Sequence, residues 1–80
     1  METDKTMRVT GFRQVIRALD AGTLIDAQIA VDADAPIKEK LLTALQNANV
    51  PYQFISTREE LGKLCGISVG AAVAGTIKTA

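Results

Sequence analysis

Two arginines and a glutamine near the start of the chain are the side chains best placed for chemistry. The segment 11–19 reads GFRQVIRAL, and its apolar residues recur every three or four positions, which predicts a helix packed on a core. Arg13 and Arg17 lie on the opposite face with Gln14 beside them. Like charges at this spacing repel by about 0.2–0.5 kcal/mol, and the helix dipole disfavours cations in the first turns. An external anion would remove both conflicts; the alternative is an ordinary solvated helix face.

A second segment, 61–74, reads LGKLCGISVGAAVA. A helix is expected to stop at Gly66, and the loop that follows contains Ile67 and Val69. Loops run over the protein surface, so an apolar loop is a candidate contact surface. The alternative is that Ile67 and Val69 begin the next strand and point into the core.

Catalytic and metal-binding constellations are largely missing. The chain has no histidine, so it lacks the usual general base and the commonest metal ligand. Cys65 has no histidine to activate it and is interpreted as an inert core thiol. The glycines within 62–70 are not followed by the Lys-Ser/Thr pair of a phosphate loop. Asp32 and Asp34 are more typical of turn and cap residues than of metal ligands. We therefore expect no enzyme activity, cofactor or metal.

The composition favours a small cytoplasmic protein. Eighty residues with 48% hydrophobic content predict one domain, 1–80, with an ample core. The single cysteine excludes an internal disulfide and is typical of a reducing compartment. No apolar run is as long as a membrane span, and the charged start METDK is not a signal peptide. We expect a monomer that does not associate with membranes.

The charge balance argues against a protein that coats nucleic acid through charge alone. Nine basic and nine acidic residues give a net charge of zero. The distribution is nevertheless uneven, because Arg8, Arg13 and Arg17 fall in a stretch with no acidic residue before Asp20. A neutral total can conceal a dipolar surface, which leaves room for a partner recognised by its shape.

Strand-like and helix-like segments alternate along the chain. A Thr57 to Glu60 capping box opens the third helix, and Asp34 is a plausible cap for the second. Short connections between alternating elements imply an α/β fold with a mostly parallel or mixed sheet and helices on both faces. The expected strands are 8–10, 27–31, 52–55 and 71–77, and the expected helices are 12–19, 37–48 and 57–66.

Two motifs carry a resemblance to a known family. Residues 11–17, GFRQVIR, are similar to Gly-x-Asn-Glu-x-x-Lys, which has Lys-Gln for Asn-Glu in bacterial forms. Residues 60–72, ELGKLCGISVGAA, meet the pattern Glu-Leu-Gly-x-x-x-Gly-Ile-x-Val-x-Ala-Ala. With the acidic loop 31–36 and the strand entry 50–52, the chain resembles the kink-turn RNA-binding family of ribosomal protein L7Ae, particularly its short bacterial YbxF-type members. The likeness runs from Val9 to Lys78.

The resemblance implies a three-layer α/β/α sandwich with a four-stranded mixed sheet. It also implies that the protein binds a kink-turn, a sharply bent RNA duplex with tandem sheared G·A pairs, in ribosomal RNA or a riboswitch. The implied RNA-binding residues belong to the first helix and to the apolar loop. They are Gly11 for close backbone approach, Arg13 and Gln14 for guanine edges, Arg17 for neighbouring bases or phosphates, and Ile67, Ser68, Val69 and Gly70 over an extruded nucleotide.

Some positions depart from the family pattern, and two other functions stay open. Phe12 replaces a small polar residue, and Arg13-Gln14 replaces Asn-Glu, which bears on base preference. One alternative is a protein-interaction adaptor that uses the same apolar loop. The other is a regulatory domain that binds a small molecule, suggested by glycines near strand ends. Neither alternative accounts for the arginine pair and the loop together.

Overall fold

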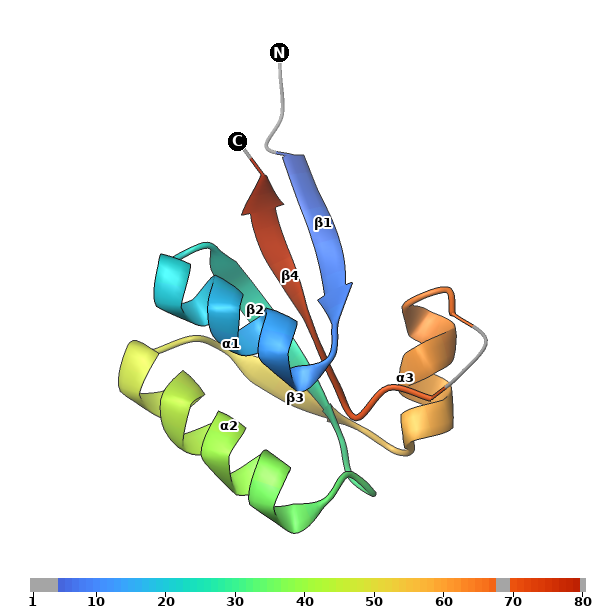
Figure 1. Cartoon of the computed structure of the whole chain (residues 1–80). Helices are drawn as coiled ribbons and strands as arrows, with labels where there is room; N and C mark the ends of the chain where they lie inside the picture. The colour runs from blue at the N-terminus through green and yellow to red at the C-terminus, as the bar shows by residue number, and fades with distance from the viewer. Residues whose placement is uncertain (1–4, 68–69, 80) are drawn as a thin grey trace.

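Strands and helices alternate along the chain in the order expected from the sequence. The computed structural model describes residues 5–67 and 70–79 (Figure 1). The seven elements are β1 (Lys5–Thr10), α1 (Phe12–Ala21), β2 (Leu24–Ala30), α2 (Ala35–Ala48), β3 (Tyr52–Ile55), α3 (Arg58–Leu64) and β4 (Val73–Thr79).

The four strands form one mixed sheet in the order β1-β4-β2-β3. Only β2 and β3 are parallel, because β4 runs back between β1 and β2 and pairs antiparallel with both. The prediction of a mixed sheet is thus confirmed, although most of the pairing is antiparallel. The pairing also explains why β1 begins at Lys5 rather than at residue 8, since Lys5 lies opposite Thr79.

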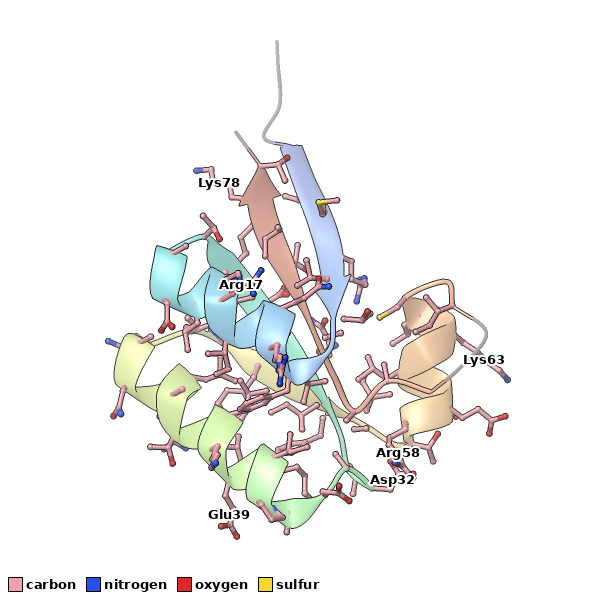
Figure 2. The ribbon with its side chains drawn as sticks, viewed as in Figure 1. Arg17, Asp32, Glu39, Arg58, Lys63 and Lys78 are labelled. Carbon is pink, nitrogen blue, oxygen red and sulfur yellow. The ribbon has the colours of Figure 1, made fainter. Side chains whose placement is uncertain are left out.

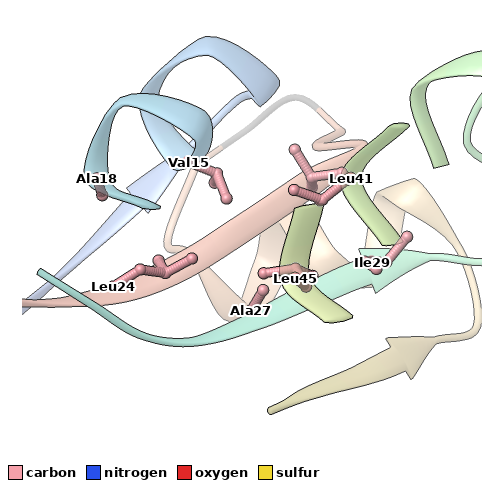
Figure 3. Packing of buried hydrophobic residues seen from close by; sticks show 8 residues of the cluster. Val15, Ala18, Leu24, Ala27, Ile29, Leu41 and Leu45 are labelled. Carbon is pink, nitrogen blue, oxygen red and sulfur yellow. The ribbon is translucent and has the colours of Figure 1, made fainter. Parts of the chain in front are cut away.

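The helices cover both faces of the sheet, which confirms the three-layer α/β/α architecture. Helices α1 and α2 lie on one face, where their side chains meet those of β2 and β4 in the larger core cluster (Figure 3). Helix α3 packs on the other face. The larger cluster consists of Val15, Ala18, Leu24, Ala27, Ile29, Leu41, Leu45 and Val73. The smaller cluster, under α3, consists of Ala30, Ala33, Leu61, Ala71 and Ala74.

The ends of the helices follow largely from local signals. Gly22 ends α1 in the left-handed conformation, with φ 76°. Thr57 caps α3, because its Oγ1 accepts a hydrogen bond from the Glu60 amide at 3.1 Å. Asp34 stands at the N-cap position of α2, but its side chain makes no capping hydrogen bond. The predicted N-cap position of Asp34 is therefore confirmed, but the predicted side-chain capping hydrogen bond is absent.

Candidate nucleic-acid interface

The start of α1 and the loop after α3 meet at one end of the sheet. The Gly11 amide donates a hydrogen bond to the Val73 carbonyl at 3.0 Å. Val73 begins β4 directly after the loop, and Thr10 pairs with Ala74 in the adjacent register position. Figure 1 shows β1 ending between α1 and α3. Strand pairing thus brings together the two segments that the sequence singles out, although they lie far apart in the chain.

Gly11 has a backbone conformation that other residues rarely adopt. Its φ is 97° and its ψ is 145°, and its carbonyl accepts the Val15 amide at 3.1 Å to begin the helix. A Cβ added at Gly11 would meet no protein atom within 4 Å. Glycine is therefore needed here for its backbone and not for tight packing inside the protein. The space beside Gly11 is open to an approaching molecule.

The polar face of α1 is exposed and has no compensating acidic residue in its first turn. Successive residues of a helix are turned by about 100°, so Arg17 lies about 40° from Arg13 and about 60° from Gln14, on the same side of α1. Gln14 and Arg17 line a hollow of about 290 Å³ whose floor includes Val9 and Ile77. Figure 2 shows Arg17 on the surface of α1. Within the described residues, no ion pair involves Arg13 or Arg17. The face thus offers two cations and an amide to an external ligand.

The loop after α3 is partly exposed. Gly66 has φ 75° and closes the helix, and the Ile67 amide donates to the Gly62 carbonyl at 3.0 Å. Ile67 is 37% exposed and precedes β4, which begins only at Val73. The alternative in which Ile67 begins the strand is therefore wrong. The predicted contacts of Ser68 and Val69 lie outside the described residues.

A cation that the sequence reasoning missed lies beside Gly70. The Arg58 amide donates to Asp32 Oδ1 at 2.8 Å, and Arg58 Nε lies 3.7 Å from the same oxygen (Figure 2). The Ala71 amide donates to the Arg58 carbonyl at 3.0 Å. A Cβ on Gly70 would come within 3.3 Å of Arg58 Cβ, so glycine lets the loop lie against this residue. Asp32, Arg58, Glu59 and Gly70 line a hollow of about 370 Å³.

The interaction of Asp32 with Arg58 also revises the interpretation of the acidic loop. Asp32 accepts a hydrogen bond at the first residue of α3, instead of capping the helix that follows it in sequence. A carboxylate at a helix N-terminus is favoured by the helix dipole. The same carboxylate holds the Arg58 guanidinium near the loop. The capping box predicts Arg58 at the start of a helix, but no sequence motif connects it to Asp32, which lies 26 residues earlier.

The remaining chemistry of the described residues is limited. Cys65 is half-buried and packs against the smaller core cluster. Within residues 5–67 and 70–79, no group of three His, Cys, Asp or Glu side chains is arranged to hold a metal ion. No described helix combines the length and apolar character needed to cross a membrane.

Known proteins resemble this chain over most of its length. The sequence model of the ribosomal protein L7Ae/L30e/S12e/Gadd45 family matches residues 1–80. The RNA-binding protein YbxF of Geobacillus stearothermophilus is 43% identical over 70 residues, covering 88% of this chain and 85% of that protein.

Two solved structures share the fold. A 15.5 kDa RNA-binding protein of Giardia lamblia superimposes with a TM-score of 0.80 at 32% identity, over 92% of this chain and 62% of that one. A protein of unknown function from Bacillus halodurans superimposes with a TM-score of 0.81 at 28% identity, over 92% of this chain and 73% of that one. Both matches extend over nearly the whole of this chain.

Proposed function

Because the chain belongs to the ribosomal protein L7Ae/L30e/S12e/Gadd45 family, we propose that it is a non-catalytic RNA-binding protein that recognises kink-turns in structured RNA. The observation that carries the proposal is the hydrogen bond between the Gly11 amide and the Val73 carbonyl. This bond ties the start of α1 to the first residue of β4, directly after the loop that follows α3, and so supports one surface formed by the two segments. The names of the YbxF and Giardia lamblia relatives support RNA as the ligand.

The start of α1 supplies the polar half of the proposed interface. Arginine and glutamine side chains donate hydrogen bonds that fit base edges, so Arg13 and Gln14 read guanines of the tandem G·A pairs. Arg17, one turn further along, stacks on neighbouring bases or binds a phosphate. Gly11 lets the RNA approach the backbone closely, since no Cβ occupies the open space beside it.

The loop supplies the apolar half. Structured RNA is recognised largely through unstacked bases, which pack on apolar and aromatic side chains. Ile67, with Ser68, Val69 and Gly70, covers the nucleotide that the kink-turn extrudes. Arg58 lies against Gly70, and its ion pair with Asp32 orients its side chain. Its guanidinium is suited to the phosphate of that nucleotide, because charge-assisted hydrogen bonds from arginine are strong and directional.

The charge balance fits recognition by shape. A neutral chain with a few local cations neutralises few phosphates, so we propose about two to four ionic contacts and a shallow dependence of affinity on salt. The remaining affinity then comes from stacking and apolar contacts. The physiological target is a kink-turn of ribosomal or riboswitch RNA, bound by a cytoplasmic monomer without a cofactor.

A direct binding comparison tests the proposal. A kink-turn RNA and a straight duplex of equal length are titrated with the protein in a band-shift assay. A third RNA, in which Watson–Crick pairs replace the G·A pairs, controls for composition and length. We expect tight binding to the kink-turn alone. Equal affinity for all three RNAs would overturn the assignment.

A second candidate function, a protein-interaction adaptor, is favoured by one further observation. Phe54 is 50% exposed and Leu64 is 56% exposed, and both line a hollow of about 440 Å³ between β3 and α3. Exposed apolar patches of this kind mark interaction sites. Substitution of Phe54→Ser and Leu64→Ser separates the two functions. Kink-turn binding should be unchanged if RNA is the ligand and the hollow plays no part in binding it.

A further inference from the structure

The face of the sheet under α3 is only partly covered. Helix α3 has seven residues and packs on the end of this face, over Ala30 and Ala74. Beyond the helix, alternation along the strands places polar side chains on the same face. We call this part the open sheet face; it consists of Thr6, Arg8, Asp26, Gln28, Thr76 and Lys78.

A chain of hydrogen bonds crosses the open sheet face. Arg8 Nη1 donates to Gln28 Oε1 at 3.1 Å, and Gln28 Nε2 donates to Asp26 Oδ1 at 3.1 Å. Strand β4 lies between β1 and β2, so the Arg8 side chain reaches across it. Gln28 is only 5% exposed, and it is the buried polar residue of the described core. A buried amide thus links an exposed arginine to a carboxylate.

This arrangement fixes the position of Arg8 before any ligand binds. Burial of an amide is unfavourable unless its groups are hydrogen-bonded, and both ends of the Gln28 amide have partners. A free arginine side chain samples many rotamers, and the bond to Gln28 already removes part of this freedom. Preorganisation of a binding group raises affinity by reducing the ordering that binding requires.

The charge of Arg8 stays available to a ligand. Within the part of the chain that the structure describes, no ion pair involves Arg8, because Gln28 stands between it and Asp26. The guanidinium has five N–H donors, and one of its nitrogens donates to Gln28. Arg8 is exposed, so the other donors are open to an external acceptor.

The position of Arg8 relates it to the candidate interface. It lies three residues before Gly11 on an extended strand, a distance of about 10 Å. Strand β1 is an edge strand, with α1 on one face of the sheet and α3 on the other. RNA that contacts both α1 and the loop after α3 must pass the end of β1 (Figure 1).

We propose that the end of the open sheet face nearest Gly11 is an additional site for the RNA backbone, where Arg8, held by Gln28 and Asp26, binds a phosphate. The inference rests on the proposed function, since it extends the same RNA past the edge of β1. Neither the α1 motif nor the loop motif includes these residues. Phosphate is the fitting ligand group, because arginine binds phosphate oxygens through two parallel hydrogen bonds.

Substitution of Arg8 tests the proposal, with a matched control on the same face. Lys78 lies opposite Thr6, further from Gly11 than Arg8 does, and Figure 2 shows it near the end of β4. Arg8→Ala should weaken kink-turn binding about tenfold and lower the slope of log K against log salt by about 0.9. Lys78→Ala should change neither quantity. Thermal unfolding of each variant establishes that it is folded at the assay temperature.

Substitution of Gln28 separates positioning from charge. Gln28→Met keeps the volume and every charge, but removes both hydrogen bonds. It should weaken binding less than Arg8→Ala does, leave the salt slope unchanged and have no further effect in an Arg8→Ala background. If Gln28→Met does not fold, Arg8→Lys keeps the charge but loses the planar guanidinium that Gln28 positions, so it should weaken binding and leave the salt slope unchanged.

The outcomes distinguish this inference from the proposed function. If Arg8→Ala binds the kink-turn with unchanged affinity and slope while the protein still rejects a straight duplex, the open sheet face is not an RNA surface and the proposed function stands. If Arg8→Ala and Lys78→Ala weaken binding equally, the effect is general electrostatics and the inference is wrong. If the unaltered protein does not bind the kink-turn, both proposals fail together.

Discussion

Replacement of Gly11 by alanine should affect both stability and RNA binding, and Gly22 provides a control for the first effect. The two glycines flank α1, and both have positive φ, 97° at Gly11 and 76° at Gly22. Because an L-residue is strained in such conformations, alanine should lower the free energy of unfolding by about 1–3 kcal/mol at Gly11 and by about 1–2 kcal/mol at Gly22. For a domain of this size, each kcal/mol lowers Tm by about 4–8 °C.

Only the Gly11 variant should lose RNA affinity beyond its loss of stability. Apart from the adjacent residues, a Cβ at either position meets no protein atom within 4 Å, so the cost to the protein at both sites is backbone strain and not a clash. At Gly11 that open space is the proposed point of close RNA approach. An overfilled contact costs about 1–3 kcal/mol, which corresponds to a loss of affinity of roughly 5- to 150-fold.

The assay compares thermal unfolding with RNA binding for the two variants. Tm is measured by circular dichroism, and kink-turn affinity is then measured at a temperature where both proteins are fully folded. Gly22→Ala should lower Tm and bind RNA normally, whereas Gly11→Ala should lower both. Equal RNA affinities for the two folded variants would show that Gly11 serves only the backbone turn, and the close-approach argument would fail.

Three further predictions concern single side chains. Gln14→Ala and Arg17→Ala should each weaken kink-turn binding by about 1–3 kcal/mol with little change in Tm, because both side chains are exposed. Lys40→Ala on α2 is the control. A variant with both Gln14 and Arg17 replaced that keeps the same Kd would show that this helix face is ordinary solvated surface. Ile67→Ser should weaken binding without altering the salt slope, whereas Arg17→Ala should lower that slope by about one; a slope change for Ile67→Ser would contradict an apolar role. Thr57→Ala removes the 3.1 Å cap bond to the Glu60 amide and should lower the free energy of unfolding by about 1 kcal/mol, so an unchanged midpoint in urea denaturation would argue against the cap.

Local sequence signals predicted the elements and several of their ends. Periodic apolar residues marked α1 and α2, Gly66 ended the segment that contains α3, and Thr57 capped that helix. These features depend on residues within a few positions of each other. Helical periodicity also identified the exposed face of α1, since each turn of a helix repeats the same geometry.

Features that depend on pairing between distant segments were not predictable in the same way. The Asp32–Arg58 contact joins the loop after β2 to the first residue of α3, which the pairing of β2 with β3 brings together. No sequence neighbour of either residue indicates this contact. Residues 27–31 were predicted as a buried strand, and Gln28 is indeed buried. Its partner Asp26 lies two residues earlier on the same strand, whereas its partner Arg8 follows only from the order of the strands, in which β4 lies between β1 and β2.

The central claim, that the start of α1 and the loop after α3 form one kink-turn-binding surface, is tested most directly by NMR. Amide chemical shifts of the labelled protein are followed while a kink-turn RNA is added. We predict that the largest changes occur together, at residues 11–17 and 66–72, and that amides of α2 and β3 stay nearly constant. Changes concentrated around Phe54 and Leu64, or confined to only one of the two segments, would contradict the account.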